Sequence, residues 1–217
     1  MSERSEAVPR AFLDYLAQRT AGDDAFFLAL KAAARAAGIP AIWIPPEQGS
    51  LLQVLLRAAR AREVVEVGTL AGYSAIWMAR ALPAGGRVRT IELAARHAAF
   101  AREWIAQSDV AGRIEVLEGR GLDRLRELPD RSVDAVFLDA DKAGYAAYAD
   151  EAARVLVPGG LLLADNAFAF GQVLDERPAD PDAPAIQDFN ERLARDARFR
   201  GLIVPIGDGL WVATRGP

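Results

Sequence analysis

The hydrophobic pattern of the chain changes at about residue 63. Before that point, apolar residues recur at the three- and four-residue intervals of amphipathic helices over 10–18, 23–37 and 47–59. We expect Asp23 to cap the second helix and Gly38 to end it. The stretch 39–46 is rich in proline and predicts a loop. Residues 1–62 are therefore expected to form a helical cap or interaction surface, as part of the same domain as the rest.

From residue 63 onward, short apolar runs alternate with helical patterns. The runs cover 63–67, 87–91, 114–117, 133–138 and 161–164, and the helices cover 73–81, 94–107, 122–128, 145–155 and 185–197. This alternation predicts parallel strands joined by helical crossovers, which make a doubly wound α/β sheet. Two last apolar runs, 199–205 and 210–214, flank an aspartate-glycine turn and predict a closing antiparallel hairpin. We expect one core over 63–217, with a mobile loop at 175–184.

The first strand, 63–67, leads through Gly68 and Gly72 into a helix. Such a turn can hold a ligand, because glycines let the backbone approach it and the helix end offers unpaired N–H groups. Glu66 puts a carboxylate beside this turn, which suits an ammonium or sulfonium group, or ribose hydroxyls, better than a pyrophosphate. The glycine spacing differs from that of dinucleotide sites and of P-loops. A tight turn without a ligand is the alternative interpretation.

Further polar residues follow the next two strands, at the edge where doubly wound sheets bind ligands. Glu92 ends the second strand about 20 residues past the glycine turn, where an acid typically binds ribose hydroxyls. An ordinary exposed glutamate is the alternative. The third strand is followed by Glu118-Gly119-Arg120-Gly121, whose small residues would either admit a flat base or form a plain turn.

Three acids, an amide and a lysine follow the fourth and fifth strands: Asp139, Asp141 and Lys142, then Asp165 and Asn166. Asp139, Asp165 and Asn166 are hard oxygen donors, which suit Mg²⁺ or Ca²⁺. Solvated loop residues explain the group less well, because unpaired carboxylates crowded at one edge would repel. Lys142 is either a counter-charge or a base whose pKa is set by its neighbours.

Composition narrows the classes of function. The 217 residues include 30 acidic and 26 basic side chains, a net charge of −4, which disfavours nucleic acid as a partner. The chain has no cysteine, so disulfides and thiolate chemistry are excluded. No stretch approaches the roughly 18 apolar residues of a membrane span, and residues 1–10 lack the apolar segment of a signal peptide. We expect a soluble cytoplasmic protein without a nucleic-acid or membrane partner.

The single histidine has a plain interpretation. His97 lies among alanines within the helix predicted at 94–107. We expect it to lie at the surface or in packing, without a catalytic role.

Six motifs occur in order over nearly the whole chain. They are I-P-P-E-Q-G at 44–49, E-V-G-T-L-A-G-Y-S at 66–74, the acid of I-E-L at 92, F-L-D-A-D-K-A-G-Y at 137–145, A-D-N at 164–166 and G-D-G-L at 207–210. Together they resemble the cation-dependent class I S-adenosylmethionine-dependent O-methyltransferases, the caffeoyl-CoA and catechol O-methyltransferase family. The resemblance implies a Rossmann-like, doubly wound, mostly parallel seven-stranded sheet with a C-terminal antiparallel hairpin strand, extra N-terminal helices and a homodimer.

The resemblance also implies roles at matching positions. The expected cofactor-binding residues, for S-adenosyl-L-methionine, are Ile44, Glu66, Gly68, Thr69, Leu70, Tyr73, Ser74, Glu92, Leu93, Gly119, Gly121 and Asp139. Asp139, Asp165 and Asn166 would ligate a divalent cation, Mg²⁺ first, with Mn²⁺ or Ca²⁺ as alternatives. Lys142 would be the catalytic base, with Asp139 beside it.

The acceptor implied by the resemblance is a small aromatic diol, a catechol or a caffeoyl-like molecule, methylated on one hydroxyl. The chain departs from the family pattern mainly on this side, and we expect four aromatic residues to hold the ring: Trp43, Phe168, Phe170 and Trp211. The rival functions are a metal-independent small-molecule methyltransferase, a nicotinamide-dependent dehydrogenase and a non-catalytic protein that keeps the cofactor pocket.

Overall fold

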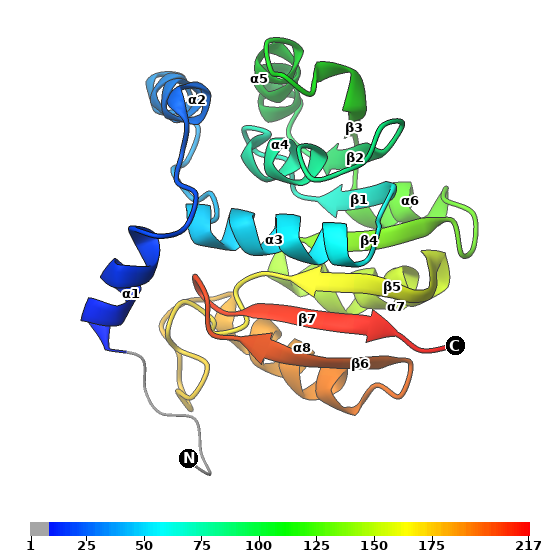
Figure 1. Cartoon of the computed structure of the whole chain (residues 1–217). Helices are drawn as coiled ribbons and strands as arrows, with labels where there is room; N and C mark the ends of the chain where they lie inside the picture. The colour runs from blue at the N-terminus through cyan, green and yellow to red at the C-terminus, as the bar shows by residue number, and fades with distance from the viewer. Residues whose placement is uncertain (1–8) are drawn as a thin grey trace.

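A computed structural model describes residues 9–217, without the side chain of Arg10 (Figure 1). The described chain begins with the three predicted helices: α1 (Arg10–Ala17), α2 (Ala25–Ala36) and α3 (Pro46–Ala58). The first eight residues of the expected 1–62 extension, and with them most of the segment compared with a signal peptide, lie outside the described residues.

The cap of α2 is Asp24, so the prediction of Asp23 is wrong by one position. Asp24 Oδ1 accepts a hydrogen bond from Phe27 N at 2.9 Å, the contact that defines an N-cap. Asp23 instead accepts from Lys31 Nζ at 2.6 Å and from Tyr73 OH at 2.5 Å. Asp23 therefore ties the N-terminal helices to the helix that follows the glycine turn. Gly38 has a φ of 69° just past the end of α2, as predicted.

Within residues 9–217, seven strands form one sheet in the order β3-β2-β1-β4-β5-β7-β6. The first five are parallel, and β7 is antiparallel to both of its neighbours. The strands are β1 (Glu63–Val67), β2 (Arg87–Glu92), β3 (Ile114–Glu118), β4 (Val133–Leu138), β5 (Leu156–Ala164), β6 (Phe199–Val204) and β7 (Leu210–Arg215). The predicted doubly wound sheet with a C-terminal hairpin is confirmed. The strand order reverses between β1 and β4, where such sheets bind their ligands.

Helices cover both faces of the sheet because strand residues alternate between two apolar layers. In β1, Val64 packs with α2, α3 and α4, whereas Val65 and Val67 pack with the layer of α7 and α8. Figure 1 shows α3 crossing in front of the sheet and α7 behind it. The remaining helices are α4 (Tyr73–Ala79), α5 (Ala95–Ala106), α6 (Gly121–Arg126), α7 (Tyr145–Val155) and α8 (Ala183–Arg195), with short 3-10 turns at Ala111–Arg113 and Lys142–Gly144.

Aromatic packing attaches α2 to the core. The Phe27 ring stacks on Trp77, with centroids 5.1 Å apart, and meets Tyr73 edge-on at 4.6 Å. Such pairs add about 0.5–1.5 kcal/mol beyond the burial of their area. Part of the N-terminal extension is thus continuous with the sheet domain.

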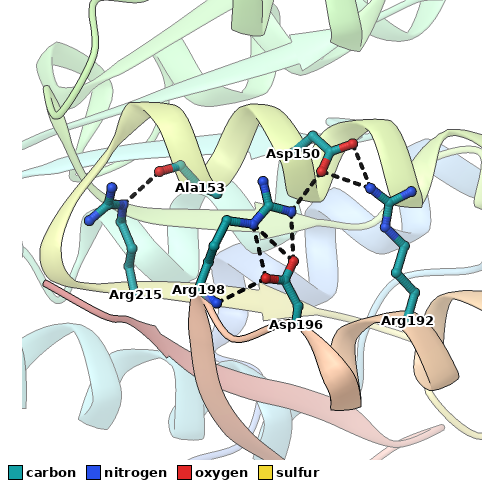
Figure 2. Close-up of polar contacts among 6 residues, drawn as sticks. All are labelled: Asp150, Ala153, Arg192, Asp196, Arg198 and Arg215. Carbon is teal, nitrogen blue, oxygen red and sulfur yellow. Dashed lines mark hydrogen bonds and ion pairs between the residues drawn. The ribbon is translucent and has the colours of Figure 1, made fainter.

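An ion-pair network fastens the C-terminal hairpin to α7 (Figure 2). Arg198, just before β6, contacts Asp150 of α7 at 2.7 Å and Asp196 at 2.6 Å. Arg192 of α8 binds the same Asp150 at 2.7 Å, and Arg215 of β7 donates from Nε to a main-chain oxygen of α7 at 2.6 Å. The hydrogen bonds from Arg198 lower the pKa of Asp196. The network lies outside the cavity described below, so we assign it to stability.

Two segments differ from expectation. The strand predicted at 161–164 begins earlier, at Leu156, because the proline and glycines of 158–160 form an irregular part of β5 instead of a turn before it. The stretch 175–184 ends in the first turn of α8, where Ala183 and Ile186 form a small apolar cluster with Ala169. Over the residues that the structure describes, no helix combines the length and the apolar character needed to cross a membrane.

Candidate functional site

A cavity of about 570 Å³ lies at the carboxyl ends of the central strands. This volume is within the range of small-molecule sites, about 300–1,000 Å³. The expected site residues that line it are Ile44, Gly68, Thr69, Leu70, Tyr73, Ser74, Glu92, Leu93, Gly119, Gly121, Asp139, Lys142 and Asn166. The structure therefore brings together residues that span more than half of the chain. Glu66 and Asp165 lie behind this lining.

The glycine turn after β1 is shaped by two close contacts. Gly68 has a φ of 103°, and a Cβ atom there would collide with the main-chain oxygen of Asp139. Glu92 holds the other side, because its Oε2 accepts from Leu70 N at 2.8 Å and from Thr69 N at 3.2 Å. Leu70 itself has a φ of 49°, a left-handed conformation that these bonds stabilise. The turn is thus positioned from both of its neighbouring strands.

The expectation that Glu66 presents a charge to the ligand is not met. Its side chain is fully buried under α4, where one oxygen accepts from Ser74 Oγ and the other from Thr90 Oγ1, the latter at 2.6 Å. Burial raises the pKa of Glu66 to about 8, against the lowering effect of these hydroxyls. The alternation of β1 explains the placement, because Glu66 shares its face with Val64 beneath α4. Glu66 supports Ser74, which does line the cavity.

Gly119 and Gly121 both border the cavity, so the sequence 118–121 is more than a distant turn. Their small size has a packing reason as well. A Cβ at Gly121 would lie 2.5 Å from Val67 Cγ1 and 3.1 Å from the ring of Tyr148. The lack of a side chain at 121 is therefore required by the neighbours of the glycine, whatever the cavity holds.

The lining also contains two aromatic residues that the sequence did not indicate as site residues. His97 was expected at the surface or in packing, but it lines the cavity with Nδ1 3.6 Å from Glu92 Oε1. Tyr148 lines it from α7 and donates its hydroxyl to Asp141 Oδ1 at 2.6 Å. Neither residue belongs to a motif. The spacing of Tyr148 three residues after Tyr145, on one face of a helix, was the available signal.

Lys142 is 7% exposed and points its ammonium at the edge of β4. Its Nζ lies 3.3 Å from Asp139 Oδ1 and donates to Tyr145 OH at 2.7 Å. Tyr145 in turn donates to Leu138 O at 3.1 Å, and burial together with nearby acids raises its pKa well above the ordinary value. Tyr145 is therefore a neutral partner that fixes the lysine position.

Asp139, Asp165 and Asn166 follow the neighbouring strands β4 and β5. Burial, and next the negative charge of Asp139, raise the pKa of Asp165. Asp165 Oδ1 accepts from Gln48 Nε2 at 2.8 Å, and Asn166 Nδ2 donates to Asp208 Oδ2 at 3.2 Å. The amide oxygen of Asn166 is thus on the side that does not face Asp208.

This donor set fits a hard divalent cation, because it combines two carboxylates with a carbonyl oxygen and no sulfur. Within residues 9–217, no group of three or more His, Cys, Asp and Glu side chains is arranged to hold a metal. The candidate set is of a different kind, since its third donor is an amide.

The four aromatic residues expected at an acceptor separate into two pairs. Trp43 and Phe170 line the cavity. Phe168 packs on Gly209, where a Cβ would lie 2.8 Å from the ring. Trp211 is held by α8, because its Nε1 donates to Asn190 Oδ1 at 2.7 Å. Phe168 and Trp211 therefore support the wall without forming it.

A cavity at the topological switch point of a doubly wound sheet defines a class of small-molecule-binding α/β proteins. Comparison with known proteins is more specific. Residues 18–216 match the model of the O-methyltransferase family. The chain is 41% identical over 185 residues to a catechol O-methyltransferase of Niastella koreensis, covering 84% of this chain and 83% of the relative. It is also 41% identical to a catechol O-methyltransferase of Mycobacterium tuberculosis, covering 81% and 78%.

A solved structure gives the same result. An O-methyltransferase from Bacillus cereus, in complex with SAH, superposes with a TM-score of 0.86 at 33% identity, covering 94% of this chain and 97% of the other. The chain belongs to the O-methyltransferase family, and the protein is an O-methyltransferase.

The buried state of Glu66 has a measurable consequence. With its pKa raised from 4.5 to about 8, the folded protein keeps a proton that the unfolded chain releases, so this contribution to stability is present below pH 4.5 and lost as the pH rises to 8. We expect Glu66→Gln, which carries no such proton, to lack this loss. As the pH rises, the free energy of unfolding of the variant, relative to that of the wild type, should increase by at most about 1.4 kcal/mol per pH unit. Urea denaturation of both proteins between pH 5 and 9 measures the difference.

The control is Glu103→Gln, at an exposed position of α5. Its free energy of unfolding should depend on pH in the same way as that of the wild type. Parallel curves for Glu66→Gln as well would show that Glu66 is ionised throughout this range.

Proposed function

We propose that the enzyme transfers the methyl group of S-adenosyl-L-methionine to one hydroxyl of a vicinal diphenol, which is a catechol or a caffeoyl-like molecule. The reaction would require a divalent cation, with Mg²⁺ as the first candidate. One observation carries the proposal: the Lys142–Asp139 pair and Asn166 line the cavity, and Asp165 lies near this pair just behind the lining. The names of the two catechol O-methyltransferases support the acceptor class, and the SAH complex of the Bacillus cereus neighbour supports the methyl donor.

The cofactor would lie along the ends of β1, β2 and β3. Glu92 would bind the ribose: its carboxylate has about four acceptor positions, and three are taken by main-chain N–H groups, including Ala94 N at 2.9 Å. About one position is left for a hydroxyl. Gly119 and Gly121 would border the adenine. The methionine part would meet the remaining expected residues of the wall: Ile44, Gly68, Thr69, Leu70, Tyr73, Ser74, Leu93 and Asp139.

Asp139, Asp165 and Asn166 would hold the cation, with Mn²⁺ or Ca²⁺ as alternatives to Mg²⁺. When bound, S-adenosyl-L-methionine supplies an electrophilic methyl group, and the cation supplies charge that lowers the pKa of a hydroxyl and orients it. The three protein donors leave open positions on an octahedral ion, so two adjacent hydroxyls are a better match than one. Trp43 and Phe170 would flank the ring from the cavity wall.

Lys142 would take the proton of the reacting hydroxyl at Nζ or stabilise the oxyanion. Tyr145 and Asp139 hold the side chain in place while it still borders the cavity, and both roles require this position. Its low exposure excludes most competing water from the amine. In-line attack depends on such fixed positions, which supply several kcal/mol in well-oriented systems.

Residues 1–62 would cover the site and form the surface of a homodimer, with 63–217 as the S-adenosylmethionine-binding catalytic core. Figure 1 shows α1 standing apart from the sheet. Four of its apolar or aromatic side chains are between 45% and 62% exposed: Phe12, Leu13, Tyr15 and Leu16. A cluster of this kind on one short helix suits a protein partner, and a second copy is the partner that the proposal names.

The proposed function is tested with labelled S-adenosyl-L-methionine, Mg²⁺ and matched pairs of catechols and their mono-O-methyl derivatives. We expect single methylation of each catechol, at least tenfold slower reaction of each derivative, and loss of activity in EDTA that Mg²⁺ or Mn²⁺ restores. Mass spectrometry identifies the products. Equal rates within a pair would exclude chelation of two hydroxyls, and full activity in chelator would indicate a metal-independent methyltransferase.

The role of Lys142 is tested by Lys142→Met. We expect turnover to fall by about 10² to 10⁴, as when a general base is removed, while binding of S-adenosyl-L-methionine is kept. Arg113→Met is the control, because Arg113 is a partly buried cation outside the cavity wall, where it donates to Leu82 O at 3.2 Å. Its turnover should stay within about fivefold of wild type, as expected without a lost base. Near-normal turnover of Lys142→Met would reduce Lys142 to a counter-charge.

The homodimer is tested by light scattering of the full chain, whose mass is 23.4 kDa. We expect twice that mass for the wild type and the single mass for the double variant Phe12→Asp/Leu16→Asp. The control is Leu174→Asp, at a position that is 92% exposed but lies outside α1. A wild type that is monomeric at micromolar concentration would refute the dimer.

A further inference from the structure

Gln48 contacts one proposed cation ligand from outside the cavity. It lies in the first turn of α3, its side chain is 0% exposed, and its Nε2 donates to Asp165 Oδ1 at 2.8 Å. The two residues are 117 positions apart in sequence. The contact therefore joins the N-terminal extension directly to the end of β5.

The orientation of the Gln48 amide follows from its partner. The NH₂ group of Gln48 faces Asp165, because Nε2 is the atom that donates to Asp165 Oδ1. Oε1 then has no hydrogen-bond partner among the described residues, and it lies where a Cβ on Gly207 would collide with it. A buried carbonyl oxygen without a partner is unfavourable, and an apolar side chain would avoid it. The amide is thus explained by Asp165 and not by packing.

Asp208 contacts Asn166, another proposed ligand, from the turn between β6 and β7 that also contains Gly207. Its Oδ2 accepts from Asn166 Nδ2 at 3.2 Å and from Phe170 N at 2.8 Å. Asn166 has a left-handed backbone, with a φ of 63°, and lines the cavity. Because Asp208 binds the nitrogen of this amide, the oxygen is the atom left for a ligand. Asp208 therefore selects which end of Asn166 is presented.

We propose that Gln48 and Asp208 are positioning residues for the cation: Gln48 orients Asp165, and Asp208 orients Asn166. The inference rests on the proposed function, which supplies the cation. All three proposed ligands come from the ends of β4 and β5, but the orientation of Asp165 depends on α3 and that of Asn166 on the turn 207–209. Cation binding is thereby coupled to the docking of both the N-terminal helices and the C-terminal hairpin.

The test measures Mn²⁺ binding to the full chain by electron paramagnetic resonance and, separately, S-adenosylhomocysteine binding by calorimetry. Gln48→Met and Asp208→Ala should each weaken Mn²⁺ binding by about 10- to 100-fold, the usual effect of losing a partner of a metal ligand. S-adenosylhomocysteine affinity should stay within about threefold of wild type, since neither residue borders the cavity. Asp208→Asn should restore most of the Mn²⁺ affinity, because its amide oxygen can still accept from Asn166.

Two matched controls make the same kinds of change at positions away from the proposed ligands. Gln53→Met is the same change on α3, at an amide that donates to Trp77 O at 2.9 Å. Asp134→Ala removes a carboxylate that accepts from Arg62 N and Glu63 N at the start of β1. Neither control should change Mn²⁺ affinity by more than about threefold, as expected for sites that share no partner with the ligands.

The double variant Gln48→Met/Asp165→Asn separates positioning from packing. If Gln48 acts through Asp165, the double variant should bind Mn²⁺ no more weakly than Asp165→Asn alone. Wild-type Mn²⁺ affinity in Gln48→Met and Asp208→Ala, or an equal loss of Mn²⁺ and S-adenosylhomocysteine binding, would overturn the inference and leave the proposed function intact. A wild type that binds no Mn²⁺ would instead overturn the cation requirement of the proposed function, and this inference with it.

Discussion

The site depends on the close approach of two main-chain segments at the centre of the sheet. Gly68, after β1, lies against the carbonyl of Asp139, after β4, with no room for a Cβ atom between them. Asp139 N also donates to Val67 O at 2.9 Å, so the two strand ends are held together beyond the regular ladder. This contact sets the glycine turn on one side of the switch point and the Asp139–Lys142 pair on the other. A transfer reaction needs its two reactants to meet at such a boundary.

Four acids surround this point, and each is accommodated differently. Glu66 is buried with two hydroxyls, and its pKa is raised to about 8. Glu92 accepts three main-chain N–H groups, Asp139 pairs with Lys142, and Asp165 accepts from an amide. The same carboxyl group thus has a different environment at each position, and burial and hydrogen-bond partners determine how readily it carries a charge. Of the four, Asp139 and Asp165 are the two that belong to the proposed cation site.

The parts of the chain outside the parallel sheet contribute at the level of support. Asp23 binds the hydroxyl of Tyr73, and Gln48 binds Asp165, so α2 and α3 are connected to both halves of the site. The turn before β7 holds the segment after β5 through Asp208. The ion pairs of Arg198 keep the hairpin on α7. Segments before and after the parallel strands thus hold side chains at the site through hydrogen bonds.

The sequence by itself determined the fold class and the location of the site. Alternation of apolar runs with helical patterns specifies a doubly wound sheet, and the polar residues that follow each run must meet at its carboxyl edge. For the same reason Glu92, Asp139 and Lys142 could be assigned to one cavity before any coordinates. The family resemblance of their motifs is borne out by the match over residues 18–216.

Only the tertiary structure decided which side chains face the cavity and which stand behind it. Glu66 is buried under α4, and Trp211 donates a hydrogen bond to Asn190. His97 lines the cavity from a helix that carries no motif. Asp24 caps α2 because it directly precedes the helix, whereas Asp23 has a distant partner in Tyr73. Local patterns specify the position of a residue along an element. The direction and partners of its side chain depend on contacts with segments far away in the sequence, which no local pattern contains.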